Sequence, residues 1–77
     1  MTLSIAQPTQ AQQQDDARRL GRTDAKGGQP CLPELYFARA TQWIAYVRGY
    51  EAQMGVQTPL SRQAWVMAST RIARGDK

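Results

Sequence analysis

The sequence predicts an all-α protein, and two features of the chain support this prediction. No segment alternates apolar and polar residues with the period of two that a half-buried strand requires. Residues that favour helix starts and helix ends instead recur along the chain: Pro33, Gly55, the pair Thr58-Pro59, and Gly75. We therefore expect a small helical hairpin, formed by residues 33–54 and 59–74, with a weaker helix before it.

The N-terminal part of the chain is the least structured in this prediction. Residues 1–14 are rich in Gln, Thr, Ser and Pro, and burial of so few apolar groups does not offset the entropy lost on ordering. We expect a flexible tail there and a single small helical domain over residues 15–77. The composition from Gln12 to Arg22 favours a helix with aspartates early and arginines late, which complements the helix dipole. Its apolar content is low, so we expect it to form only when docked.

A loop rich in residues that interrupt helices separates this weak helix from a long one. Glycine and proline are concentrated between Gly27 and Pro33. Pro33 followed by Glu34 suits a first helical turn, and Gly55 suits the residue after the last turn. One continuous helix is therefore expected over residues 33–54.

Two stripes run along that expected helix at 100° per residue. The broad apolar stripe consists of Tyr36, Trp43, Tyr46, Val47, Tyr50 and Met54, and the shallow stripe of small residues consists of Ala38, Ala45, Gly49 and Ala52. A glycine in mid-helix costs about 1 kcal/mol relative to alanine, so Gly49 indicates a close approach. The approaching group is the first helix, the last helix, a second copy of the chain or a nucleic-acid backbone.

The last helix is bounded by good local signals. Thr58 and Pro59 form an N-cap and first-turn pair, and the helix is expected to end near Arg74, before Gly75. Its broad apolar face consists of Leu60, Ala64, Trp65, Ala68 and Ile72.

The charge of the chain is moderately basic. Its 77 residues include 10 Lys+Arg and 6 Asp+Glu, for a net charge of +4, and eight of the ten cations are arginine. The planar guanidinium suits phosphate and stacks on bases, whereas lysine is the commoner choice for surface solubility. The excess charge is compatible with a patch that attracts polyanions and equally with an ordinary basic surface.

Enzymatic chemistry is not indicated. The chain has no histidine, and Cys31 is its one cysteine, without a base to activate it or a partner for a disulfide or zinc site. Asp15 and Asp16 are adjacent and so point from different faces of a helix. We expect no catalytic residue, no cofactor and no metal site. Because no secretory signal and no apolar run of roughly 20 residues occurs, we expect a cytoplasmic protein without a membrane partner.

The candidate binding residues combine arginines with aromatics. They are Arg39, Trp43, Tyr46, Arg48, Tyr50 and Arg62. Such a set is suited to RNA, where bases stack on rings and phosphates pair with guanidinium groups. The alternative is that Trp43, Val47, Tyr50 and Met54 belong to the core against the last helix. That arrangement still leaves Tyr36, Tyr46, Arg48 or Arg62 for a partner.

Four features of residues 17–52 form one pattern: the glycines Gly21 and Gly28, the loop Pro30-Cys31-Leu32-Pro33, the approach Arg39 to Trp43, and the segment Tyr46-Val47-Arg48-Gly49-Tyr50. This pattern, over roughly residues 17–52, resembles the ribosome modulation factor family. The chain departs from the family in five ways. Leucine rather than proline follows Cys31, the first aromatic of the motif is tyrosine, and the distance from the loop to the motif is longer. The family is also more basic, and it lacks a helix equivalent to residues 59–74. The resemblance implies binding to ribosomal RNA and protein, with ribosome inactivation or dimerisation.

Three functions follow as hypotheses. The first is a small basic protein that resembles ribosome modulation factor and occludes a ribosomal or other structured RNA–protein surface. The second is a phage- or plasmid-encoded inhibitor that binds one host protein through the aromatic helix face. The third is a DNA-binding regulator in which the hairpin serves as a helix-turn-helix. The surplus aromatic surface is also compatible with a homodimer.

Overall fold

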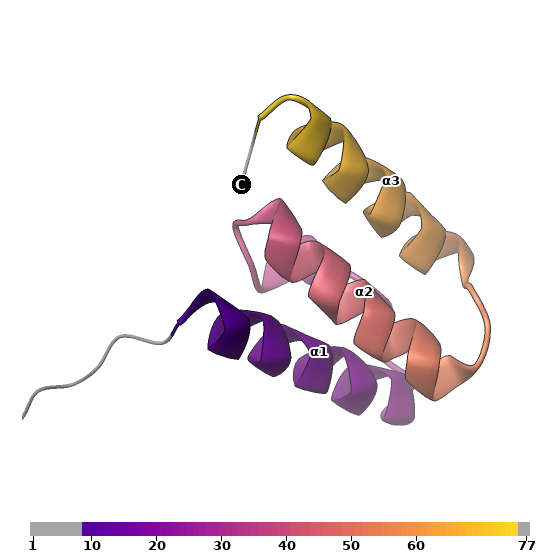
Figure 1. Cartoon of the computed structure of the whole chain (residues 1–77). Coiled ribbons are helices and arrows are strands. Elements are labelled where there is room, and N and C mark those ends of the chain that lie inside the picture. The colour runs from indigo at the N-terminus through magenta and orange to yellow at the C-terminus, as the bar shows by residue number, and fades with distance from the viewer. Residues whose placement is uncertain (1–8, 76–77) are drawn as a thin grey trace, which may run out of the picture.

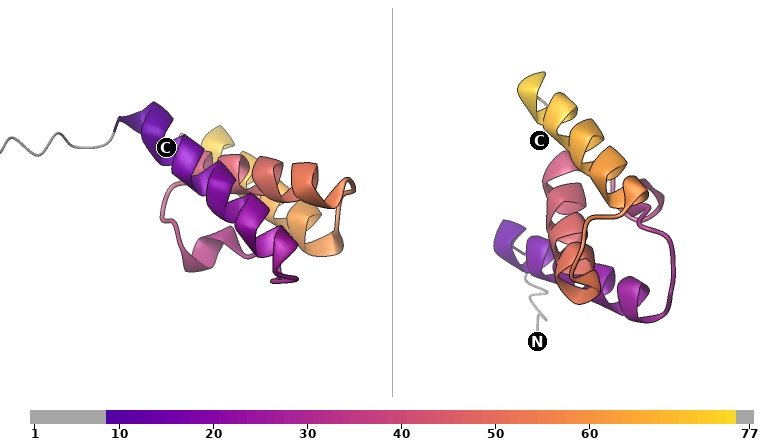
Figure 2. Two further views of the ribbon diagram at one scale, coloured as in Figure 1. Left: turned by 90° about the horizontal axis from the view of Figure 1, so that it is seen from below. Right: turned by 90° about the vertical axis from the view of Figure 1, so that its right-hand side faces the viewer.

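Three helices form a single layer in the structure, a computed structural model that describes residues 9–75 (Figure 1). They are α1 (Gln10–Lys26), α2 (Ala40–Met54) and α3 (Pro59–Ala73), and a short 3₁₀ turn, η1 (Pro33–Leu35), precedes α2. Helix α2 lies in the middle, and the segment 27–39 crosses only one side of the layer (Figure 2). The predicted all-α class and the α2–α3 hairpin are confirmed.

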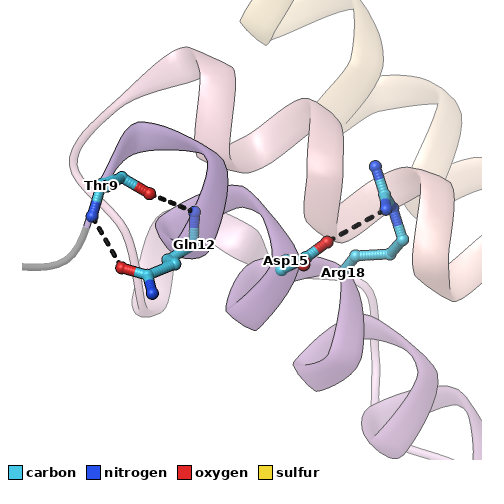
Figure 3. A network of polar contacts seen from close by, with 4 residues as sticks. All are labelled: Thr9, Gln12, Asp15 and Arg18. Carbon is cyan, nitrogen blue, oxygen red and sulfur yellow. Dashed lines mark hydrogen bonds and ion pairs between the residues drawn. The ribbon is translucent and has the colours of Figure 1, made fainter.

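Helix α1 is longer than predicted at both ends. The Gln12 N–H donates to Thr9 Oγ1 at 3.1 Å, and the Thr9 N–H donates to Gln12 Oε1 at 2.9 Å (Figure 3). This reciprocal capping box fixes the start of the helix. Residues 10–14, predicted as part of the flexible tail, are therefore helical. Residues 1–8 of that tail lie outside the part of the chain that the structure describes.

Two glycines allow α1 and α2 to touch backbone to backbone. A Cβ atom at Gly49 would overlap the carbonyl oxygen of Arg18, and one at Gly21 would overlap the carbonyl oxygen of Tyr46. Of the groups that could approach Gly49, the first helix is the one that does so. The contact between α1 and α2 is the most extensive in the molecule, because small residues on α1 (Ala17, Gly21 and Ala25) are buried against α2.

The prediction of one helix over residues 33–54 is wrong in its first third. The chain makes one 3₁₀ turn at η1, and Arg39 is extended with φ −99° and ψ 136° before α2 begins at Ala40. Tertiary contacts explain the break. The Trp43 indole N–H donates to the Phe37 carbonyl oxygen at 2.6 Å, and the Phe37 ring meets the Tyr46 ring edge-on. A straight helix would carry Phe37 away from both groups.

The connection between α2 and α3 follows the sequence signals closely. Gly55 ends α2 in the left-handed conformation with φ +77°, as expected for a C-cap glycine. Thr58 caps α3 through a second capping box with Ser61, which confirms the predicted start at Pro59. Ala64 and Ala68 are buried against α2, and this contact is smaller than that between α1 and α2.

Within the part of the chain that the structure describes, no helix is both long and apolar enough to cross a membrane.

Candidate binding face

The three aromatic candidates on α2 lie in the interior. Trp43, Tyr46 and Tyr50 retain only 6%, 0% and 5% of their accessible surface, so their rings pack and are not available to stack on a base. Their polar atoms are also engaged: Trp43 binds the Phe37 carbonyl, and the Tyr50 hydroxyl donates to the Gln29 carbonyl oxygen at 2.6 Å. Of the two roles considered for these rings, the structure supports packing.

Tyr46 anchors a buried polar contact between α1 and α2. Its hydroxyl donates a hydrogen bond to the carboxylate of Asp24, which is itself buried. Burial, and then this hydrogen bond, raise the pKa of Tyr46 well above its ordinary value. Residues 9–75 contain no buried side-chain nitrogen or oxygen without a hydrogen-bond partner, so this interior offers no unpaired polar group to a ligand.

Arg48 lies on the side of α2 opposite the loop. The 27–39 segment covers the side that carries Tyr46 and Tyr50, through the Gln29 hydrogen bond and the Phe37 ring contact. Arg48 stands two residues from each tyrosine, which is about 200° around the helix. It is exposed, and its guanidinium carbon lies 5.7 Å from the centroid of the Trp65 ring on α3. That distance is within the range of a cation–π contact.

Two arginines of α1 share this side of the layer. Asp24 and the partly buried Leu20 point toward the core on the loop side. Arg22 is two residues from each of them, and Arg18 is two residues from Leu20, so both arginines lie roughly opposite. The backbone of Arg18 also abuts Gly49, beside Arg48, and Figure 3 shows the Arg18 side chain reaching toward α2.

Together these residues define what we call the open face, the side of the helical layer turned away from segment 27–39 (Figure 2). On α3, Arg62 precedes Trp65 by three residues, close to one helical turn, and is exposed on the same side. The open face consists of Arg18 and Arg22 from α1, Arg48 from α2, and Arg62 and Trp65 from α3.

An arginine–tryptophan pair lies on each side of the contact between α2 and α3, and in each pair the two residues come from different helices. On the open face, Arg48 of α2 lies over Trp65 of α3. On the loop side, Arg71 of α3 lies 4.6 Å from the ring centroid of Trp43 of α2. Each pair contributes about 0.5 to 2 kcal/mol, depending on its exposure. The pair on the open face also places the Arg48 guanidinium beside Trp65.

Three carboxylates of the described residues already have partners. Asp24 is bound to Tyr46, and Glu51 accepts a hydrogen bond from the Ser61 hydroxyl at 2.8 Å. Asp15 forms a 3.3 Å ion pair with Arg18 one turn along α1 (Figure 3). An exposed pair of this kind contributes little to stability, so a stronger anion can replace Asp15 as the partner of Arg18.

The remaining predicted residues separate into two places. Arg62 joins the open face and also lines a shallow hollow with Gln57, Thr58 and Pro59. Arg39 is exposed at the N-terminal end of α2, beside the loop, away from the open face. The sequence-based set therefore contained two of the five open-face residues, Arg48 and Arg62.

Arg18, Arg22 and Trp65 were missed as site residues. Arg18 and Arg22 are one turn apart in the sequence, but the helix dipole accounts equally well for arginines late in the expected helix. Trp65 had been assigned to a general apolar face, and nothing local indicates that Arg48 of another helix covers its ring.

Cys31, which has no base to activate it in the sequence, is also shielded from solvent in the structure. Cys31 is buried at 1% exposure, and burial, followed by the charges of Glu51, Glu34 and Asp24, raises the pKa of its thiol to about 12. It is therefore a poor nucleophile near neutral pH. No group of three His, Cys, Asp or Glu side chains within residues 9–75 is arranged to hold a metal ion.

Comparison with known proteins gave no match to this chain among protein-family models, curated proteins or solved structures.

Proposed function

We propose that this chain is a non-catalytic binding protein that docks on structured RNA through the open face. The resemblance to ribosome modulation factor makes ribosomal RNA the first candidate for that surface. Binding occludes the RNA surface, and no bond is made or broken. The protein then acts in the cytoplasm, where ribosomes are found.

The single observation that carries this proposal is the gathering of four exposed arginines from all three helices on one side of the layer. Arginine forks fit phosphate oxygens, and a patch of one sign raises the rate of encounter with a polyanion. The resemblance supplies an independent reason to choose RNA, because its motif, Tyr46 to Tyr50, includes Arg48.

A protein partner is the main competing hypothesis. The inhibitor hypothesis relied on the aromatic face of α2, but Trp43, Tyr46 and Tyr50 are buried. Exposed apolar side chains occur elsewhere, including Leu35 at 70% and Val56 at 61% exposure. The DNA-binding hypothesis is not favoured by the antiparallel course of α2 and α3, because helix-turn-helix motifs cross at a steep angle (Figure 1).

Co-sedimentation with purified ribosomes tests the proposal. The protein is mixed with ribosomes at low salt, separated on a sucrose gradient and located by immunoblotting. We expect it to travel with the ribosomal particles and to leave them when salt is raised from about 50 to 200 mM, because phosphate contacts release counterions. A protein that stays at the top of the gradient at low salt contradicts the proposal.

Matched variants show whether the open face is responsible. Arg48→Ala and Arg62→Ala should reduce the ribosome-bound fraction. Arg74→Ala removes the same charge from an exposed residue nine positions after Trp65, which is about two and a half turns and therefore on the opposite side of α3. Association that is insensitive to salt and to both open-face variants would instead favour a protein partner.

A further inference from the structure

We infer that the open face takes the phosphate backbone of double-helical RNA and does not take unstacked single-stranded bases. This inference rests on the proposed function, and it names the class of RNA that the face recognises.

The aromatic side chains provide the first argument. Proteins that bind single-stranded nucleic acid stack successive bases on exposed rings, whereas double-helical RNA is recognised by shape and backbone contacts. Trp43, Tyr46 and Tyr50 are buried, and the Trp65 ring already carries the Arg48 guanidinium. The open face therefore presents no free aromatic platform.

Tyr36 is an aromatic residue that remains exposed. Half of its surface is exposed, but its ring lies 5.8 Å from the Tyr46 ring, on the side of α2 that the loop covers. A base stacked on Tyr36 would lie across the layer from Arg48. The exposed aromatic and the arginines of the open face consequently do not act on the same nucleotide.

The layout of the arginines provides the second argument. Single-strand sites usually lie in a charged groove that follows one backbone. Here the arginines come from three helices that lie in one layer (Figure 2). The axes of packed helices are in general about 8 to 10 Å apart. The Cα atoms of the molecule span only 17 Å along its shortest axis. Charges distributed over three neighbouring helices suit the repeated phosphates on both sides of a duplex groove.

The two ends of this face can make phosphate contacts independently. Arg22 and Arg62 are exposed, on the outer helices α1 and α3, and Arg48 lies between them on α2. Arg22 and Arg62 can each pair with a phosphate without moving the backbone, because their long side chains are exposed.

Fluorescence anisotropy with two labelled RNAs tests the inference. One RNA is a hairpin with a stem of about one helical turn, and the other is an oligouridine with the same number of phosphates. We expect the full-length protein to bind the hairpin at least about tenfold more tightly at equal salt, because only the hairpin has a fixed double-helical shape. Equal or tighter binding of oligouridine would overturn the inference but leave the proposed function standing. If neither RNA binds, the proposed function fails as well.

Two substitutions provide a second readout. Arg22→Ala should weaken hairpin binding severalfold, whereas Tyr36→Leu, which retains an apolar side chain over Tyr46, should leave it unchanged. The reverse pattern, in which Tyr36→Leu abolishes binding and Arg22→Ala has no effect, would show that a base stacks on the loop side and would overturn the inference.

Discussion

At the scale of single residues, close contacts between α1 and α2 determine which substitutions the protein tolerates. Gly21 and Gly49 each face backbone atoms of the opposite helix, which cannot rotate away as a side chain can. Tyr46 and Asp24 form a polar contact that is closed to water. Sites of both kinds are expected to be sensitive, because overpacking and an unpaired buried polar group are both costly.

Gly21→Ala should destabilise the protein although alanine favours helices. The new Cβ would overlap the Tyr46 carbonyl oxygen, and the resulting backbone shift should cost about 1 to 3 kcal/mol. Thermal unfolding followed by circular dichroism measures this change. Gly27→Ala is the matched control, because its Cβ would be in ordinary contact, 3.5 Å from the Thr23 carbonyl oxygen. Equal stability of the two variants would show that α1 and α2 are not packed as described.

Tyr46→Phe should lower the free energy of unfolding by about 1 to 3 kcal/mol, because it leaves the buried Asp24 carboxylate without this donor. Urea unfolding of Tyr46→Phe, Asp24→Asn and the double variant separates the pair from its surroundings. We expect the double variant to lose less stability than the two single losses added together. Strict additivity would mean that the two side chains do not interact.

The buried thiol should make stability fall at alkaline pH. The pKa of Cys31 is raised from 9.0 to about 12, so the folded state holds this proton more tightly than the unfolded state. The stabilising effect is complete below pH 9.0 and is lost as the pH rises toward 12. The tyrosines Tyr36, Tyr46 and Tyr50, whose pKa values are raised above 10.0, act in the same direction at higher pH.

Comparing the urea midpoints of the natural chain and Cys31→Ala between pH 9.0 and 10.0 isolates the cysteine, because both proteins contain the same tyrosines, which begin to titrate there from an ordinary pKa of 10.0. Cys31→Ala should have a flatter pH profile than the natural chain in this window. Identical slopes for the two proteins would contradict the assignment of a protected thiol.

At the scale of elements, α3 is held more weakly than α1. Its buried residues are small (Ser61, Ala64 and Ala68), and its contact with α2 is less extensive than that of α1. Large apolar residues of α3 remain exposed, among them Val66 at 57% and Ile72 at 40%. Local opening follows such differences in buried contact.

Hydrogen exchange should therefore show that α3 opens locally more often than α1 and α2. We expect amides in the middle of α3 to exchange faster than those in the middle of α2. Ala68→Leu should accelerate exchange in α3 alone, because Ala68 is fully buried beside Ala40 and Trp43. Ser69→Leu, at the exposed neighbouring position, is the control. Protection of α3 equal to that of α2 would indicate that the three helices unfold as one unit.

Elements with local signals were predicted well, and those that depend on tertiary contacts were not. Gly55 and Thr58-Pro59 encode the turn between α2 and α3 in their own conformational preferences. The break before α2 depends on Trp43 reaching the Phe37 carbonyl, which a local pattern does not show. Helix α1 was underestimated because it packs through small residues, so its apolar content alone is a poor guide to its docking.

At the scale of the whole molecule, the layer has two unlike sides. The loop covers one side of the layer (Figure 2). The aromatics there are buried, and the open face is left with arginines from three helices. The sequence indicated an arginine–aromatic combination but not this division, because the face on which each side chain lies depends on where the loop returns. The charge of +4 is modest, yet much of it acts from one side.

The central claim, that the open face contacts RNA phosphates, is tested most directly by the salt dependence of RNA-hairpin binding. The logarithm of affinity is plotted against the logarithm of salt concentration for the natural chain, Arg22→Ala, Arg62→Ala and the control Arg74→Ala. We predict that the slope becomes shallower by about one for each open-face variant and is unchanged for Arg74→Ala. A slope that is the same in all four proteins would contradict the claim.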